Sequence, residues 1–478
     1  MKEQKAAVYR MTEGNPVSLI IMFSIPMLIG NLFQQVYNLV DSVVVGQVVG
    51  ADALAAIGAT NSVTFLFFAL CNGIGNGGGI ITSQFFGKGD DGAVKSCIIN
   101  TGYVMLVFPL AVGITAFFLS APILRLLETP PEIMGEAVAY MKIMCVGIVF
   151  VSLYNYASSM LRALGDSKTP LFFLIFSCLL NTGLDLLFVC VFRMSVRGAG
   201  IATVISQFVS GITCLGYAMW KNSYFKFSRE DLKYNAMITG KVLKLGIPLS
   251  LQFSLIAISC MALQKVVNSY GKVTVAAFTA TSRIEQIIHQ PYQTLGAALS
   301  TFTGQNYGAN KMDRVKDGYQ KGLLLMLIFS ILMLPVMQFF GEAIIRFFVE
   351  EEPVIKMGAK ALRITSFFYV MLGMIYVVRG VLNGLGDSIF ALLNGIVEVF
   401  GRFIVPVMMV KVPAIGLWGI WWSVGIVWAL SGVTAVMRYV SFKRSLMRRM
   451  KAIREEDRSI SKNAFQTEGW GSGRNIEH

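Results

Sequence analysis

The chain has 478 residues, of which 55% are hydrophobic and 14% are charged, and its formal net charge is +14. Its mean hydropathy of +0.63 lies above that of soluble globular chains, which indicates a polytopic membrane protein. The positive charge does not indicate nucleic-acid binding, because Lys and Arg gather in short stretches between apolar segments and not on one basic face.

The N-terminal stretch is polar and lacks the short apolar core of a cleavable signal peptide. The apolar segments that follow are each long enough to cross about 30 Å of hydrocarbon, which takes roughly 20 residues. We therefore predict an all-α polytopic membrane protein with twelve transmembrane helices, near residues 17–46, 53–84, 94–119, 133–162, 169–192, 198–220, 240–268, 275–304, 317–341, 356–385, 389–411 and 414–440.

Two acidic residues interrupt the first half of this pattern. Asp41 lies deep in the first segment, and Asp185 lies in the fifth, four residues after Asn181 and therefore on the same helix face. A charge at bilayer depth costs about 2.5 to 3.5 kcal/mol, so such acids indicate function. Polar neighbours of Asp41 on the same segment are Gln34, Tyr37 and Asn38.

Two carboxylates in one dry pocket raise each other's proton affinity, because desolvation and like charge both disfavour ionisation. This predicts a site for a proton or a monovalent cation such as Na⁺ at Asp41 and Asp185, with Asn181 and Thr203 completing the oxygen shell. The alternative is that permanently protonated carboxyl groups only hold helices together.

The second segment contains GIGNGGG, from Gly73 to Gly79. No strand precedes it and no Lys-Ser/Thr pair follows, so it is not a phosphate-binding loop. Small residues in a membrane helix allow a neighbouring helix to approach closely, and we expect such an approach here.

The basic residues are distributed unevenly between the two sides of the membrane. They concentrate at the N-terminus, in alternate loops and after the last segment, and Arg162 is among them. Because cytoplasmic loops carry an excess of Lys and Arg, we predict that both termini are cytoplasmic and that the protein is a multi-pass protein of the cell membrane. Arg379 and Asn383, near the cytoplasmic end of their segment, are expected to contact lipid headgroups.

The chain repeats itself at an offset of 221 residues. SQFFGKGDDGAVK ending at Lys95 resembles GQNYGANKMDRVK ending at Lys316, and ALGDS ending at Ser167 resembles GLGDS ending at Ser388. An offset that spans six crossings indicates two parallel repeats, with the solute path between them near mid-bilayer. The predicted parts are a cytoplasmic N-terminus (1–16), an N-lobe (17–220), a cytoplasmic linker (221–239), a C-lobe (240–440) and a basic, then disordered tail (441–478).

The repeat does not preserve the acids of the first half. The offset places Asp185 on Pro406 and Asn181 on Arg402, so the second half needs its own polar candidates. One candidate is Glu285, for which the alternative is a pair with Arg283 or His289 on the same helix face. The other is Glu398 with Arg402. At a spacing of four these two are expected to form an intrahelical ion pair or to contact substrate.

The motifs YNLVDSVVVG, LRALGDS with LLNTGLDLLFV, and TATSRIEQI with GAALSTFTGQNYGA resemble the multidrug and toxic compound extrusion (MATE) family, and most closely its DinF-like branch. The resemblance implies antiport, in which an organic cation or amphipathic drug leaves while protons or sodium ions enter. It places the coupling cation at Asp41, Asn181, Asp185 and Thr203, and a polar network at Tyr37, Tyr140 and Asn155. The NorM branch carries an acid in the seventh helix, which GIPLSLQFSLIAISCMALQ lacks.

The predicted function is cation-coupled multidrug efflux by alternating access of two lobes, in a monomer that needs no cofactor beyond the coupling ion. A flippase for a lipid-linked or amphipathic metabolite is the alternative, but it would need a cationic cavity, and the first-lobe acids favour cationic cargo. A channel suits a buried acid pair less well than a gated carrier does. An enzyme is not expected, because the chain has two histidines and neither HExxH nor GxSxG.

Overall fold

The computed structural model describes residues 10–468, and that part of the chain is helical without β-strands. The first half contains α1 (Pro16–Val48), α2 (Ala51–Lys88), α3 (Asp91–Leu126), α4 (Pro131–Ala163), α5 (Lys168–Asp185), the π-helix η1 (Leu186–Val191) and α6 (Ser195–Lys221). After a linker with the short η2 (Ser223–Phe225) come α7 (Ala236–Asn268), α8 (Lys272–Gly308), α9 (Met312–Arg346), α10 (Glu352–Ser366), α11 (Tyr369–Gly384), α12 (Ser388–Met409), η3 (Gly416–Trp418) and α13 (Gly419–Glu468).

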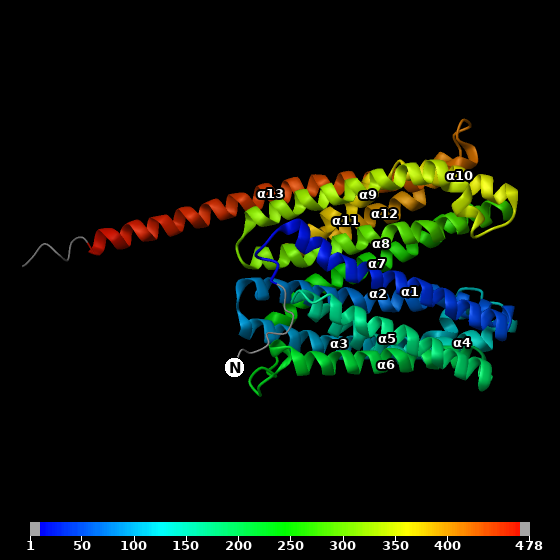
Figure 1. The fold of residues 1–478 in the computed structure, drawn as a ribbon, viewed down its shortest axis with the longest axis horizontal. Coiled ribbons are helices and arrows are strands. Elements are labelled where there is room, and N and C mark those ends of the chain that lie inside the picture. The colour runs from blue at the N-terminus through cyan, green and yellow to red at the C-terminus, as the bar shows by residue number, and fades with distance from the viewer. Residues whose placement is uncertain (1–9, 469–478) are drawn as a thin grey trace, which may run out of the picture.

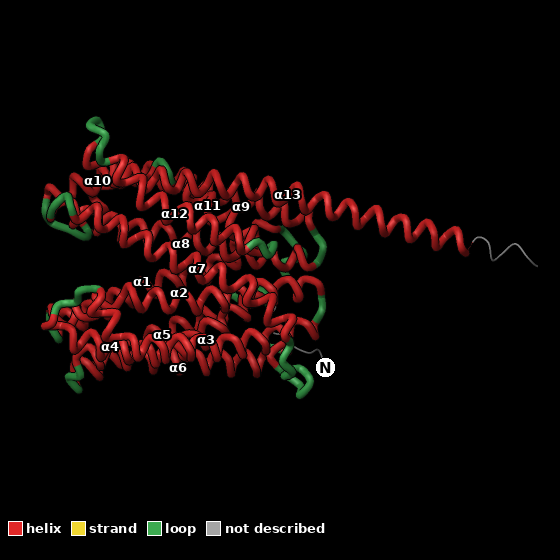
Figure 2. Tube along the Cα trace, turned by 180° about the vertical axis from the view of Figure 1, so that it is seen from behind, coloured by secondary structure: helices red, strands yellow, loops and turns green. Residues whose placement is uncertain are grey.

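These helices make up the predicted twelve crossings. Helix α5 and η1 together form the fifth, and α10 and α11, bent by 52° where they meet, form the tenth. Within the described residues, nine single helices and this bent pair are long and apolar enough to cross a membrane. Helices α7 and α8 run alongside them in the bundle (Figures 1 and 2). The prediction of an all-α polytopic membrane protein with twelve helices is confirmed.

Local sequence signals explain where several helices begin. Asn15 accepts a hydrogen bond from the backbone N–H of Val17 at 2.9 Å, and Pro16 occupies the first helical position of α1. Asp90 accepts from the N–H of Ala93 at 3.0 Å at the start of α3. A side-chain oxygen at this position satisfies an N–H that has no partner within the helix, and proline fits there because it has no N–H to leave unpaired.

The helices form two bundles that lie side by side (Figure 1). We call α1–α6 the first lobe and α7–α13 the second lobe. Residues 10–15, the linker 222–235 and the extension of α13 all lie at one end of the molecule, which we call the basic end. The view from behind shows the same two bundles running in parallel (Figure 2).

The two lobes exchange the starts of their first helices. Met11, Ile20 and Phe23, which precede or begin α1, belong to the hydrophobic core of the second lobe. Conversely, Val242 and Leu249 of α7 are packed in a core of the first lobe. The boundaries predicted from the repeat do not include this exchange, which ties the lobes together at the basic end.

Glycines permit the lobes to approach closely at this end. A methyl group on Gly77 of α2 would meet the backbone of Gly246 of α7, and one on Gly73 would overlap Ser250. The prediction of close approach from GIGNGGG is therefore confirmed. Nearer the basic end, α2 and α8 cross, and a methyl group on Gly87 or on Gly308 would overlap the backbone of the other helix.

The tail differs from the prediction of disorder. Helix α13 continues without a break to Glu468, as the long red helix of Figure 1 shows. The physical reason is that residues 433–468 contain neither Gly nor Pro and are rich in Lys, Arg and Glu, which favour helix. The last ten residues lie outside the described part of the chain.

Candidate functional site

Asp41 of α1 and Asp185 at the end of α5 meet inside the first lobe, with their carboxyl groups in hydrogen-bonding contact. Asp185 is 1% exposed, and Asp41 is half-buried. The Oδ1 atom of each carboxyl group is buried and accepts no hydrogen bond. No ion pair in the described part of the chain includes either residue.

Neutral polar groups surround this acid pair. With the amide of Asn181 oriented so that its nitrogen faces acceptors, Nδ2 donates to Oδ2 of Asp185 at 2.8 Å and to the hydroxyl of Tyr37 at 3.1 Å, and Oδ1 accepts from the backbone N–H of Thr203 at 3.0 Å. The hydroxyl groups of Tyr37 and Thr203 are 3.4 Å apart. The four residues predicted to hold the coupling cation thus lie together, on α1, α5 and α6.

Helix packing explains how these side chains reach one another. Tyr140 of α4, 6% exposed, lies near both carboxyl groups and packs against Gly200 of α6, where a larger residue would press on its ring. Directly after Asp185 the helix widens into η1. Short π-helical stretches are rare and occur frequently at functional sites.

Two of the other residues predicted for this pocket differ in their burial from the four residues predicted to hold the cation. Gln34 and Asn38 are exposed on α1. Asn155 is half-buried on α4, and within the described residues it has no hydrogen bond to either carboxyl group. The polar helix face that the sequence indicates around Asp41 therefore separates into Tyr37, which joins the pair, and two residues that point outward.

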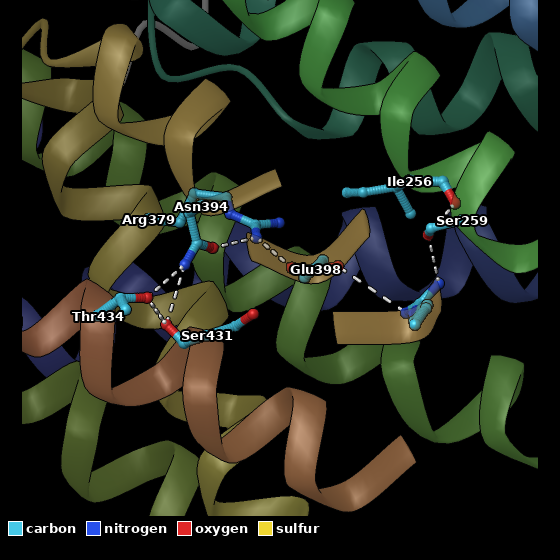
Figure 3. A network of polar contacts seen from close by, with 8 residues as sticks. Ile256, Ser259, Arg379, Asn394, Glu398, Ser431 and Thr434 are labelled. Atoms are coloured by element: carbon cyan, nitrogen blue, oxygen red, sulfur yellow. Dashed lines mark hydrogen bonds and ion pairs between the residues drawn. The ribbon is translucent and has the colours of Figure 1, made fainter. Parts of the chain in front are cut away.

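The second lobe contains an ionic network of two arginines and one glutamate at the place related by the repeat to Asn181 (Figure 3). Glu398 of α12 pairs with Arg379 of α11 at 2.7 Å and with Arg402, one turn along its own helix, at 3.8 Å. The ion pair with Arg402 is present as predicted, but the shorter one is with Arg379. Arg379 also donates to Asn394 at 2.6 Å and, with the amide of Gln252 oriented to accept, to Gln252 at 2.8 and 3.0 Å.

The expectation that Arg379 contacts lipid headgroups is wrong, because its side chain is only 12% exposed and turns toward Glu398. Sequence spacing could not show this, since the partner lies on another helix. Glu285 and His289 of α8 are not paired with each other in the described residues. Oε1 of Glu285 and Nε2 of His289 are each buried without a hydrogen-bond partner.

A separate cavity of about 200 Å³ lies between the lobes. Two arginines, Arg162 of the first lobe and Arg379 of the second, line it, and its described lining contains no acidic residue. The sequence signal for Arg162 was its place in the last turn of α4, which suggested only a base near the cytoplasm. Other polar lining residues are Asn76, Ser83, Ser159, Gln293, Ser300, Thr301, Tyr376 and Asn383.

Comparison with known proteins identifies the family. The MatE family model matches residues 26–187 and 248–407. The chain is 33% identical over 434 residues, 90% of this chain and 96% of the relative, to "Probable multidrug resistance protein YpnP" of Bacillus subtilis (strain 168). It is 25% identical to "Multidrug export protein MepA" of Staphylococcus saprophyticus, over 91% of this chain and 96% of that protein.

The fold matches solved structures over most of its length. A transporter of the MOP superfamily from Pyrococcus furiosus Vc1 (DSM3638) superimposes with a TM-score of 0.84 at 22% identity, covering 92% of this chain and all of that one. The family match, the twelve-helix fold and the sequence motifs agree. The chain belongs to the MatE family, which the motifs first indicated as the multidrug and toxic compound extrusion family.

Proposed function

We propose that this protein is an antiporter that exports organic cations and amphipathic drugs across the cell membrane in exchange for an inward-moving cation. The observation that carries the proposal is the meeting of Asp41 and Asp185, each with a buried oxygen that accepts no hydrogen bond. Burying a carboxyl oxygen without a hydrogen-bond partner costs free energy, and a site that binds and releases a positive ion explains why such an arrangement exists. The printed names of the relatives, multidrug resistance and multidrug export proteins, agree with this class of cargo.

The amide of Asn181 suits either coupling ion. With its nitrogen toward Asp185 it donates to the carboxyl group, which fits a proton shared between Asp41 and Asp185. With its oxygen toward Asp185 it supplies an oxygen ligand of the kind that sodium needs. We propose the proton, because a shared proton needs no ligand beyond the two carboxyl groups.

The way the lobes meet supports alternating access. Close contacts of α2 with α7 and α8 close the basic end in this structure. If the basic end faces the cytoplasm, as the distribution of Lys and Arg predicts, this conformation is closed to the cytoplasm. Loading the acid pair from outside and loading the cavity from inside would then favour opposite conformations.

The energy of the coupling step depends on the charge of the cargo. One positive charge that moves inward down a membrane potential gains about 2.3 kcal/mol per 100 mV, which corresponds to roughly a fiftyfold concentration ratio of a cargo without net charge. In a one-for-one exchange for a cationic drug the two charge movements cancel, so the concentration gradient of the coupling ion drives the export. We expect Asp41→Asn to abolish exchange because an amide cannot take up and release the proton.

The test uses the purified chain in lipid vesicles loaded with a fluorescent cationic dye. An imposed pH gradient and an imposed sodium gradient are applied in separate experiments, with Asp41→Asn and Asp185→Asn as variants and Asp52→Asn, an exposed acid of α2, as the matched control. Dye movement driven by the pH gradient alone, lost in both variants and kept in the control, supports the proposal. Movement driven only by sodium would replace the proton with Na⁺, and undiminished movement in Asp41→Asn would remove Asp41 from the mechanism.

A further inference from the structure

The cavity between the lobes has the opposite charge to the acid pair. Its described lining contains two arginines and no carboxylate, whereas the acids of the first lobe meet elsewhere, on α1 and α5. A cavity that received only cationic groups would gain from acidic lining residues, since opposite charges attract most strongly where water is scarce. The lining therefore indicates a role for an anionic group.

The two arginines of the cavity are not equivalent. Arg379 is neutralised by Glu398 at 2.7 Å and bonded to Asn394 and Gln252, so little of its donor capacity remains. Arg162 has no carboxylate within ion-pair distance in the described residues. Within the part of the chain that the structure describes, its guanidinium donates to two hydroxyl groups, those of Ser158 and Ser159, the latter at 3.2 Å.

The surroundings of Arg162 present further polar groups to the same cavity. A guanidinium has five N–H groups, and the two serines accept from only two of the nitrogens. Ser159 donates to Oδ1 of Asn76 at 3.4 Å, so the amide nitrogen of Asn76 remains available. Asn383 lines the opposite side. Its Oδ1 is buried without a hydrogen-bond partner among the described residues, and its amide nitrogen is the group that can donate to a carboxylate.

We propose that Arg162 binds the carboxylate of an amphipathic solute in the interlobe cavity, with Asn76 and Asn383 as neutral partners. A planar guanidinium matches a carboxylate with two parallel hydrogen bonds, and the positive charge of Arg162 has no carboxylate partner among the described residues. This inference rests on the proposed export function and specifies its cargo: zwitterionic drugs that carry an acid beside their cationic group are bound better than their esters.

The experiment measures equilibrium binding of two dyes to the purified full chain by fluorescence anisotropy. Tetramethylrhodamine carries a free carboxylate beside its cationic ring system. In its methyl ester the negative charge of the carboxylate is removed and the positive charge remains. We expect the unmodified protein to bind the acid about tenfold or more tightly than the ester, since hydrogen bonds to charged groups contribute about 1.5 to 3 kcal/mol. Equal affinity for acid and ester in the unmodified protein would overturn the proposal, whatever the variants do.

Variants of Arg162 localise the effect. Arg162→Gln is expected to remove the preference for the acid while binding the cationic ester at least as tightly as the unmodified protein does, because a repelling positive charge is gone. Retained binding of the ester also shows that the variant is folded. Arg162→Lys is expected to keep part of the preference, because it retains the charge but not the paired hydrogen bonds. Arg162 lies in the last turn of α4, and a role confined to stabilising that helix end would leave the preference intact in Arg162→Gln, contrary to the proposal.

Two further arms of the experiment distinguish the carboxylate site from a failure of ion coupling and from a site for a lipid pyrophosphate. Asp41→Asn should bind both dyes with the same preference as the unmodified protein, so a failure of ion coupling would not appear as a failure of the carboxylate site. In the second arm, farnesyl pyrophosphate competes with the acid dye. If it displaces the acid dye at lower concentration than tetramethylrhodamine itself does, the site is for a lipid pyrophosphate and the assignment to a carboxylate is wrong.

Discussion

Gln84 of α2 and Gln305 of α8 lie 221 residues apart, and each donates a hydrogen bond across the boundary between the lobes. Nε2 of Gln84 donates to the carbonyl oxygen of Gly384 at 2.8 Å, and Nε2 of Gln305 donates to that of Ala163 at 3.0 Å. Ala163 and Gly384 are also 221 residues apart. The two bonds are therefore related by the internal repeat, and they close the basic end symmetrically.

Removing both glutamine side chains should open the basic end. Each neutral hydrogen bond contributes about 0.5 to 1.5 kcal/mol, so Gln84→Ala with Gln305→Ala is expected to raise the open population about tenfold. A cysteine introduced at Gln293, an exposed residue of the cavity lining, reports this through its reaction with a membrane-impermeant maleimide added from the side of the basic end. Gln264→Ala, which removes a bond within α7 alone, is the control, and equal labelling rates in both backgrounds would show that the glutamines do not hold the lobes together.

Substituting a glycine at the crossing of α2 and α8 should open the basic end as removing the two glutamine side chains does. A methyl group at Gly87 would overlap the carbonyl oxygen of Gln305, a backbone atom that cannot turn aside. We expect Gly87→Ala to increase maleimide labelling at position 293 from the basic end and to slow dye export. Gly135→Ala is the matched control, because nothing lies within 4 Å of a methyl group there, and it should behave as the unmodified protein does.

The acid pair should lower stability in exchange for function. Asp185→Asn replaces a buried acid with an amide that can donate to Asp41, which removes the cost of unpaired oxygens, about 1 to 3 kcal/mol each. We expect this variant to unfold at a higher temperature in detergent although it no longer transports. Asp387→Asn is the informative comparison, since Asp387 is paired with Arg438 at 2.8 Å, and it should unfold at a lower temperature. A lower unfolding temperature for Asp185→Asn would indicate that the pair is structural.

Removing the carboxylate from the ionic network of Figure 3 should lower stability, in contrast to Asp185→Asn. Glu398→Gln leaves Arg379 and Arg402 without their shared counter-ion, and breaking a buried pair costs about 3 to 5 kcal/mol. Thermal unfolding should therefore show a large loss of stability, whereas Glu342→Gln, which removes an exposed pair with Arg363 at 3.7 Å, should cost at most about 1 kcal/mol. Replacing Arg379 and Glu398 together with apolar residues is expected to destabilise less than Glu398→Gln alone; a larger loss in the double variant would contradict this account.

The sequence by itself determined the twelve helices, the internal repeat and the residues of the acid pair. Long apolar runs have few alternatives to helices in a bilayer, because every backbone polar group must be satisfied within the segment. The spacing of four between Asn181 and Asp185 fixed their common face in the same way, and a carboxylate inside an apolar run is conspicuous at any position.

Only the tertiary structure decided which of these residues meet. Asp41 and Asp185 are 144 positions apart, and the packing of α1 against α5 brings their carboxyl groups together. From the sequence, Arg162 and Arg379 are both bases near a helix end. The packing of the helices places both of them in the lining of the interlobe cavity. Gln84 and Gln305 occupy matching positions of the repeat in the sequence. Their hydrogen-bond partners are backbone carbonyl groups, which every residue has, so the sequence could not predict these bonds.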